Sequence, residues 1–391
     1  MATPFSAARL LAGGRVVTPD GVITSGWVHV EDRDIVSVGA RRPAIDAPVV
    51  DLDGAWLLPG LIDLHMHGGG GHSVAASPEG MEKAVAFHRH HGTTATLVSL
   101  MTAPVDDLAE QLTWAAALAR RGPTARGDVL GSHLEGPFLS PRRSGAQNAA
   151  HMIEPDRHVL DRLAAAADGT LRMVTLAPEL EGALPLIAGL RRQGVIVAMG
   201  HSDATYEQAT AAIHAGANHA THLFNAMPTL HHRAPGLIGA ALEAGLPCEL
   251  INDGHHLHPA VVGLVARLIS CPVLITDAME AAGVGDGTFV LGDQEVRVHQ
   301  GEARLARTDS LAGSTLTMAE AVRRAVIDSG LTLAAASAAA SINPARVLGA
   351  DAQLGSIAPG RRADLVVLDD DLQVTAVMAG GRWCDRDRVS A

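Results

Sequence analysis

The chain has 391 residues, of which 47% are hydrophobic and 18% are charged, and its formal net charge is −12 at pH 7. This length allows one large domain, with or without a small second one, and the composition is typical of a globular protein with a sizeable core. The negative charge argues against a general nucleic-acid-binding protein, although it does not exclude small anionic substrates.

Three cysteines, Cys248, Cys271 and Cys384, show neither CxxC spacing nor the pattern of a disulfide framework. We therefore expect a reducing, cytoplasmic environment. The first residues, MATPFSAARLLAGGRVV, lack a convincing apolar signal-peptide core, and no apolar stretch reaches 18 residues. We therefore expect neither a secretion signal nor a membrane-spanning helix.

Short, alternating strand-like segments occupy residues 7–56, with turn residues between them, as in GRVVTPDGVITSGWVHVEDRDIVSVG. The segment 355–383 near the other end has the same character. Such alternation is typical of half-buried β-strands. Neither segment is long enough for a domain of its own, so we expect residues 1–57 and 346–391 to pair in one small β-sandwich domain.

Residues 58–345 show a different pattern, in which apolar runs alternate with alanine-rich helical stretches. Continuously apolar runs are expected for parallel strands that are buried on both faces. Eight strand–helix units predict an α/β fold, namely a (β/α)8 barrel of the TIM type. The eight runs are residues 60–65, 93–100, 129–136, 171–179, 194–202, 217–225, 248–254 and 272–279. The helical stretches include residues 79–91, 105–121, 181–193, 205–215 and 258–270.

Histidines and carboxylates follow many of these runs. In a (β/α)8 barrel the C-terminal strand ends meet at one rim, where the active site lies. The first run ends in LHMHGGGG, and because residues i and i+2 of a strand face the same way, His65 and His67 are expected side by side. The histidines of stretch 79–91, among them His88, are expected at the surface instead. The set at the rim comprises His65, His67, Glu135, His201, His222, His255, His256 and Asp277.

This set favours a divalent metal, and its imidazole and carboxylate groups do not distinguish Zn²⁺ from Fe²⁺ or Mn²⁺. The only lysine, Lys83, falls in the first helical stretch rather than at a strand end, so a carboxylated lysine bridging two metals is not expected. Glu135 is then the natural candidate for a shared ligand. A bound metal lowers the pKa of its water from about 15.7 towards about 7, and Asp277 could act as general base and then as acid. The residues therefore predict metal-assisted hydrolysis of an amide-like bond.

Six motifs give the chain a specific resemblance. They are PGLIDLHMHG (59–68), HLEGPF (133–138), GHSDA (200–204), THLFNAM (221–227), ITDAMEAAG (275–283) and LAGSTLTM (311–318). Over nearly its whole length the chain resembles the amidohydrolase superfamily and, within it, the N-acetylglucosamine-6-phosphate deacetylases. The resemblance implies that Glu135, His201 and His222 hold the main metal and that Asp277 is the catalytic acid/base.

The resemblance also implies a set of substrate contacts. Asn225 and Ala226 match the positions that grip the sugar phosphate, and His256 matches a sugar-binding histidine. Arg233 matches an arginine that reaches the phosphate from the neighbouring subunit, which implies a homodimer with shared active sites. Arginine suits this role because its planar guanidinium can bind phosphate through two hydrogen bonds.

Two features vary within the family that the chain resembles. Some members lack the first H-x-H and use one metal, whereas this chain retains His65 and His67, so we expect one or two metals per subunit, with Glu135 bridging them. Some members carry a histidine in the loop 136–155 that helps to polarise the substrate carbonyl, and here that position is Gln147. A glutamine can donate a hydrogen bond to that oxygen but supplies no positive charge.

The predicted function is hydrolysis of N-acetyl-D-glucosamine 6-phosphate to D-glucosamine 6-phosphate and acetate, in amino-sugar catabolism or cell-wall recycling. A second hypothesis is another amidohydrolase activity, on a cyclic amide, a dipeptide or a purine-like ring. A third, a non-catalytic assembly protein that kept the barrel, is disfavoured because the predicted ligands and Asp277 are all present. No membrane or nucleic-acid partner is expected.

Overall fold

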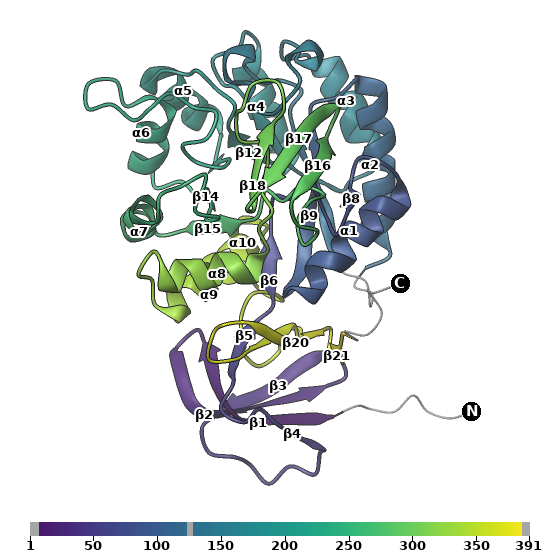
Figure 1. Cartoon of the computed structure of the whole chain (residues 1–391), viewed down its shortest axis with the longest axis vertical. Coiled ribbons are helices and arrows are strands. Elements are labelled where there is room, and N and C mark those ends of the chain that lie inside the picture. The colour runs from purple at the N-terminus through teal and green to yellow at the C-terminus, as the bar shows by residue number, and fades with distance from the viewer. Residues whose placement is uncertain (1–7, 123–127, 385–391) are drawn as a thin grey trace.

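The structure is a computed structural model that describes residues 8–122 and 128–384. Its centre is a sheet of eight parallel strands surrounded by helices, which is the predicted (β/α)8 architecture (Figure 1). Seven of the eight apolar runs contain one of these strands, and the run 93–100 coincides with β9 except for the last residue of that strand. In sheet order they are β6 (Leu61–Asp63), β9 (Thr93–Met101), β10 (Val129–Glu135), β11 (Leu171–Leu176), β12 (Ile196–Met199), β13 (His219–Ala220), β14 (Cys248–Ile251) and β15 (Pro272–Ile275).

The ring of strands closes between β15 and β6, just beyond their ends. A parallel bridge joins Met66 to Ala278, and the backbone N–H of His67 donates to the carbonyl of Ala278 at 2.8 Å. The N–H of Asp277 donates to the carbonyl of His65, also at 2.8 Å. The backbone hydrogen bonds that close the barrel are therefore made by the predicted metal ligands His65 and His67 and by the predicted acid/base Asp277.

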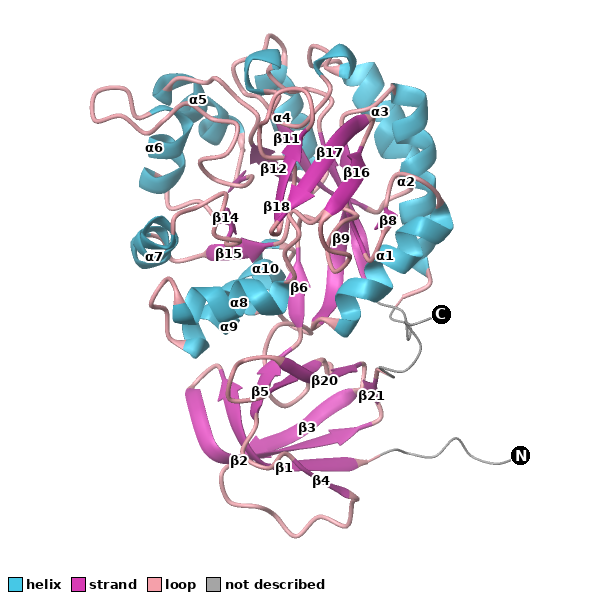
Figure 2. Ribbon diagram, in the orientation of Figure 1, coloured by secondary structure: helices cyan, strands magenta, loops and turns pink. Residues whose placement is uncertain are grey.

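The helices lie around the outside of the strands (Figure 2). In α2, Leu108, Leu112 and Ala115 form the buried face, with the spacing expected of an amphipathic helix. Thr205 begins α5 with a capping box, in which its side chain accepts from the N–H of Gln208. The helices are α1 (Pro78–His90), α2 (Val105–Arg120), α3 (Arg157–Ala166), α4 (Ala183–Arg192), α5 (Tyr206–Ala215), α6 (Gly236–Glu243), α7 (Pro259–Leu268), α8 (Met318–Ile327), α9 (Leu333–Ala340) and α10 (Ile342–Val347).

The two terminal segments form the predicted small β domain, and its strands are hydrogen-bonded into one continuous sheet. Strand β5 joins the two ends of the chain, because it pairs with β1 on one side and with β19 on the other. Side chains from six of the strands meet in one apolar cluster, among them Leu11, Val28 and Leu365, so the sheet curls around its own core. The strands are β1 (Arg9–Thr18), β2 (Gly21–Glu31), β3 (Asp34–Gly39), β4 (Val49–Asp51), β5 (Trp56–Pro59), β19 (Leu365–Leu368), β20 (Val374–Ala379) and β21 (Arg382–Trp383).

The small sheet lies next to the N-terminal end of β6, because β5 leads into that strand after a single residue, Gly60 (Figure 1). The N–H of Gly60 donates to the backbone carbonyl of Asp364 at 2.8 Å. The division into residues 1–57 with 346–391 and residues 58–345 stays a prediction. Among the described residues, no helix is both long and apolar enough to cross a membrane.

A three-stranded antiparallel sheet follows the last barrel strand and was not predicted. It consists of β16 (Gly287–Leu291), β17 (Gln294–His299) and β18 (Glu302–Leu305). The sequence carries a signal for it, since Val296 and Val298 alternate with polar residues and Gly292 and Gly301 stand at the turns. Its Leu291 reaches the cavity described below. A two-stranded piece, β7 (Gly68–Gly69) with β8 (His72–Ser73), follows the H-x-H.

Candidate metal centre

Six buried side chains from five strand ends converge at one rim of the barrel. They come from the segment after β6, from the last residue of β10, and from the residues that follow β12, β13 and β15. Each has at most 8% of its surface exposed. The six are His65, His67, Glu135, His201, His222 and Asp277. Five of them, all except Asp277, form two triads with metal-ligand spacing, and Glu135 belongs to both.

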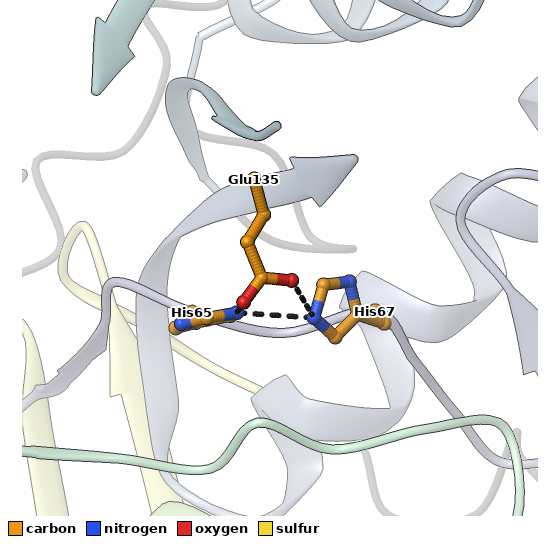
Figure 3. Close-up of side chains that lie close together, drawn as sticks. All are labelled: His65, His67 and Glu135. Carbon is orange, nitrogen blue, oxygen red and sulfur yellow. Dashed lines mark hydrogen bonds and ion pairs between the residues drawn. The ribbon is translucent and has the colours of Figure 1, made fainter. Parts of the chain in front are cut away.

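The first triad consists of His65, His67 and Glu135 (Figure 3). The two Nε2 atoms of the histidines lie 3.0 Å apart. The carboxylate of Glu135 faces both rings, with Oε1 at 3.5 Å from Nε2 of His65 and Oε2 at 3.4 Å from Nε2 of His67. Three ligand atoms of suitable chemistry therefore point to one place.

The second triad consists of Glu135, His201 and His222. Oε1 of Glu135 lies 3.1 Å from Nε2 of His201 and 3.0 Å from Nε2 of His222. These two Nε2 atoms are themselves 3.0 Å apart. Because Oε1 of Glu135 faces His65 as well as the second pair and Oε2 faces His67, the carboxylate has the geometry of a bridge between two sites.

The hydrogen bonds of the rings show that the triads suit a cation. Nδ1 of His67 donates to the backbone carbonyl of Ser99 at 3.0 Å, and Nδ1 of His201 donates to that of Arg143 at 2.9 Å. A carbonyl oxygen can only accept, so Nδ1 of each ring carries a proton and Nε2 is the nitrogen left to bind a metal through its lone pair. Lone pairs directed at one point from several rings and a carboxylate match a divalent metal such as Zn²⁺.

The charge balance of the site favours the same interpretation. Burial lowers the pKa of His67, but its contacts with Asp277 and Glu135 outweigh burial and raise the pKa to about 9. For Glu135, burial raises the pKa, but His65, His201 and other neighbouring histidines hold it well below the usual range. The carboxylates therefore remain ionised and attract positive charge to the triads.

Strained backbone positions the second triad and Asp277. The φ angles of His201, His222 and Asp277 are 47°, 27° and 50°, in the left-handed region that residues other than glycine rarely adopt. Such strain persists only where the surrounding structure enforces it, and it is concentrated at functional sites. These residues therefore leave their strands with side chains turned into the rim.

Asp277 lies beside the first triad and faces the open side of the site. Its Oδ1 lies 3.1 Å from Nε2 of His67 and 3.5 Å from Nε2 of His65. Burial raises the pKa of Asp277, but His65 and His67 outweigh it, and the pKa falls below its ordinary value. An ionised carboxylate at this position can accept a proton from a water held at the triads.

A cavity of about 210 Å³ opens onto the triads. The residues predicted to contact substrate within one chain, Asn225, Ala226, His256 and Gln147, all line it. Nδ1 of His256 is held by Asp253 at 2.7 Å, which orients the ring. The cavity is also lined by His67, Glu135, His201, His222 and Asp277, so ligands and predicted substrate contacts share one space.

Arg233 does not line the cavity of its own chain. It lies in the segment between β13 and α6, where it is exposed and its Nη1 lies 2.7 Å from Nε2 of His232. This placement is compatible with the expectation that Arg233 acts on a neighbouring subunit.

Comparison with known proteins identifies the family. Residues 56–384 match the model of the amidohydrolase family. The chain belongs to this family. The fold is shared by amidohydrolases of low sequence identity. The structure of an enamidase, for example, covers 96% of this chain at 15% identity with a TM-score of 0.63.

Several amidohydrolases resemble this one much more closely. An N-acetylgalactosamine-6-phosphate deacetylase of Escherichia coli O157:H7 is 40% identical over 95% of this chain and 98% of its own. An N-acetylglucosamine-6-phosphate deacetylase of Bacillus subtilis is 36% identical over 94% of each chain. The structure of N-acetyl-D-glucosamine-6-phosphate deacetylase from Mycobacterium smegmatis has a TM-score of 0.90 at 42% identity, covering 96% of this chain and 100% of its own. The resemblance predicted from the six motifs is confirmed.

The loop residue Gln147 is fixed at both ends of its amide. Its Oε1 accepts from the backbone N–H of Thr102 at 2.7 Å, and its Nε2 donates to Oε2 of Glu135 at 2.6 Å. Because a backbone N–H can only donate, the amide oxygen must face Thr102, and the NH₂ group must face the carboxylate. Gln147 thus orients the carboxylate of Glu135, which both triads of this amidohydrolase share.

Sequence reasoning missed Glu249, which is fully buried in β14 and hydrogen-bonds Nδ1 of His65 at 3.1 Å. Its only signal was a carboxylate within the apolar run CELI. The expected surface position of His88 was wrong, because this side chain is 1% exposed. Nε2 of His88 donates to the carbonyl of Gly68 at 2.8 Å, so the histidine anchors the glycine loop that follows the H-x-H.

Proposed function

We propose that this protein is a metal-dependent deacetylase of N-acetyl-D-glucosamine 6-phosphate, which it hydrolyses to D-glucosamine 6-phosphate and acetate. One observation carries the proposal: two ligand triads that share Glu135 face the same cavity as Asp277. The amidohydrolase family and the names of the similar deacetylases support the reaction type and the substrate class. An amino-sugar catabolic or cell-wall recycling role in the cytoplasm follows from that substrate.

The metal ligands are assigned from the two triads. Glu135, His201 and His222 would hold the main metal, and His65 and His67 would hold a second one together with Glu135. Zn²⁺ fits these nitrogen and oxygen ligands, as do Fe²⁺ and Mn²⁺. A bound divalent metal would polarise the amide carbonyl and lower the pKa of water from about 15.7 towards about 7.

Asp277 would move the proton. Its carboxylate is ionised and lies at the wall of the cavity, so it can accept a proton from the attacking water. The same carboxyl group can then give the proton to the nitrogen of the leaving amino sugar. General acid–base catalysis of this kind is typically worth about 10²- to 10⁴-fold in rate.

The substrate would be held by four residues of the chain. Asn225, Ala226 and His256 line the cavity and would contact the sugar phosphate. Nε2 of Gln147 carries two hydrogens, and since one is donated to Glu135, the other remains available for the carbonyl oxygen of the N-acetyl group. Such a donor stabilises the negative charge that develops on that oxygen.

We further propose a homodimer in which Arg233 of one subunit binds the phosphate in the cavity of the other. The exposed position of Arg233 outside its own cavity supports this arrangement. The guanidinium group would bind the phosphate through paired, charge-assisted hydrogen bonds.

The names of the similar proteins specify two different sugars, N-acetylgalactosamine and N-acetylglucosamine, so one must be chosen as the proposed substrate. The Escherichia coli relative carries the name of an N-acetylgalactosamine-6-phosphate deacetylase. We favour N-acetylglucosamine because a Mycobacterium smegmatis enzyme of 42% identity and a TM-score of 0.91 was solved in complex with N-acetyl-D-glucosamine-6-phosphate. Cyclic amides, dipeptides and purine-like rings are not favoured.

Steady-state hydrolysis of three compounds tests the proposal. N-acetylglucosamine 6-phosphate should give the highest kcat/KM, its 4-epimer N-acetylgalactosamine 6-phosphate a lower value, and unphosphorylated N-acetylglucosamine the lowest. A higher value for the 4-epimer would move the assignment to the galacto sugar. No hydrolysis of any of the three by the metal-loaded protein would refute the deacetylase assignment.

A further inference from the structure

We propose that Glu249 is a positioning residue that fixes the His65 ligand and sets the affinity of the metal at the His65–His67–Glu135 triad. Glu249 has 0% of its surface exposed and is not among the residues that line the substrate cavity. It is therefore placed to act through a ligand rather than on the substrate. The inference rests on the metal dependence that belongs to the proposed function.

The carboxylate of Glu249 contacts one residue of each triad, but in different ways. Its Oε2 accepts from Nδ1 of His65 at 3.1 Å, a contact with the ring itself. The same oxygen accepts from the backbone N–H of His222, also at 3.1 Å. The ring of His222 is therefore not held by Glu249, whereas the ring of His65 is.

The contact with His65 selects the form of the ring that can bind a metal. A carboxylate that accepts from Nδ1–H keeps the proton there and leaves Nε2 with a free lone pair. This Nε2 lies 3.0 Å from Nε2 of His67 and 3.5 Å from Oε1 of Glu135. A carboxylate behind a histidine also raises its basicity as a ligand.

Among the described residues, the charged side-chain partners of Glu249 are histidines alone, with no arginine or lysine beside it. Its third partner is Nε2 of His219, at 3.1 Å, and within the described part of the chain Nδ1 of His219 has no hydrogen-bond partner. Since a carboxylate can only accept, Nε2 of His219 donates to Glu249. No arginine or lysine of the described chain forms an ion pair with Glu249. A fully buried carboxylate without an arginine or lysine partner is costly, and a divalent metal held by Nε2 of His65 would supply compensating charge.

A purely structural role would rest on backbone contacts, which survive side-chain substitution. The N–H of Leu223 donates to the backbone carbonyl of Glu249 at 2.8 Å, and β14 pairs with β13 and β15 through its main chain. Glu249→Gln keeps the volume of the side chain and one accepting oxygen but removes the charge. This variant therefore separates the charge of Glu249 from its packing.

Metal titration of the whole protein, stripped by a chelator, tests the inference. Zn²⁺ uptake is followed by equilibrium dialysis with elemental analysis. The wild type should bind two ions, and in Glu249→Gln the affinity for the second ion should fall about 10- to 100-fold while the first ion binds as before. Unchanged affinity for both ions, an equal loss at both sites, or a wild type that binds a single ion would overturn the proposal.

Glu179→Gln is the matched control. Glu179 accepts from the hydroxyl of Ser202 at 2.7 Å and from the N–H of Asp203 at 2.6 Å, so it lies near the same rim but contacts no ring of either triad. This variant should bind both ions as the wild type does. A loss of the second ion equal to that in Glu249→Gln would show a general effect of charge and contradict the role of Glu249.

Two further variants keep the test decisive. If Glu249→Gln does not fold, Glu249→Asp retains the charge but withdraws it from His65 and should show the same selective loss. In a His65→Ala background, Glu249→Gln should leave the affinity of the remaining site unchanged, since its effect passes through His65. A different result would refute the proposed function: wild-type protein with two bound ions that releases no acetate from N-acetylglucosamine 6-phosphate.

Discussion

The two ligand triads share Glu135 but are held in place by different means. His65 and His67 come from one strand end, and Nδ1 of each ring is hydrogen-bonded, to Glu249 and to a backbone carbonyl respectively. His201 and His222 come from two strand ends, and both adopt left-handed backbone. Nδ1 of His201 donates to a backbone carbonyl, but Nδ1 of His222 has no partner among the described residues. Oε1 of Glu135 lies closer to the second pair, at 3.1 and 3.0 Å, than to His65, at 3.5 Å.

The comparison shows two ways of placing a ligand. In the first triad both rings are held by hydrogen bonds at Nδ1, and the two histidines lie on one short segment of the chain, so a local change in sequence can remove both. The second triad depends on strained backbone that is part of the barrel itself. We therefore expect catalysis to depend more on the second triad and metal stoichiometry to vary more at the first.

Replacing Asp277 should have the largest effect on activity. Asp277→Asn keeps the shape of the side chain but removes the proton acceptor next to the first triad, so kcat should fall about 10²- to 10⁴-fold. Metal content should stay at the wild-type value, which elemental analysis of the same sample would show. Near-normal turnover would remove the acid/base assignment.

Deleting one ring from each triad tests the difference between them directly. His201→Ala should reduce kcat/KM by more than His67→Ala, because Glu135 lies closer to the second pair. Loss of a residue that supports a metal ligand typically lowers metal affinity or activity about 10- to 100-fold. His201→Ala removes a proposed ligand itself, so its kcat/KM should fall by at least as much. Equal losses in the two variants would mean that the triads act as a single unit.

The phosphate contact should have a smaller and selective effect. Arg233→Ala should raise KM for N-acetylglucosamine 6-phosphate by roughly 10- to 100-fold, since hydrogen bonds to charged groups contribute about 1.5–3 kcal/mol. The KM for the unphosphorylated sugar should not change, and this substrate is the control. If both KM values rise together, Arg233 does not bind phosphate.

His88 should have the smallest effect on catalysis and a measurable effect on stability. Burial lowers the pKa of His88 to about 4, whereas an unfolded chain has a value of 6.5. Above pH 6.5 the neutral side chain is compatible with both states. Between pH 6.5 and 4 the unfolded chain takes up a proton that the folded protein refuses, so the wild type should lose roughly 3 kcal/mol of stability there.

His88→Gln should remove this part of the pH dependence. Glutamine can still donate to the carbonyl of Gly68 but does not titrate. The free energy of unfolding, measured with urea at pH 7.5 and at pH 4.5, should therefore fall less on acidification in the variant than in the wild type. The same fall in both proteins would show that His88 titrates normally.

The fold was predictable from sequence because each strand of a parallel barrel is buried on both faces. In β9, for example, eight of nine residues are buried, and the run TTATLVSLM is visible at once. Strands β17 and β18 alternate between buried and more exposed residues, which is a period-two signal in the sequence. The pair His65 and His67 could be recognised from sequence because both predicted ligands lie on one short segment.

Other parts of the site could not be predicted from sequence. Nothing in the run CELI shows that Glu249 faces two histidines rather than solvent, because its partners come from other strands. His88 looked like one polar residue on a helix, and only the position of the loop at Gly68 shows that it is buried. The positions of Glu249 and His88 depend on contacts with residues far away in the sequence, whereas the strands can be recognised from the local pattern of apolar residues.

The most direct test of the account is acetate release from N-acetylglucosamine 6-phosphate while metal is added back stepwise to the chelator-treated protein, with bound metal counted in the same samples. The account predicts no release without metal, and release that rises as metal fills the Glu135–His201–His222 triad. Acetate release by the metal-free protein, or none when both triads are filled, would contradict it.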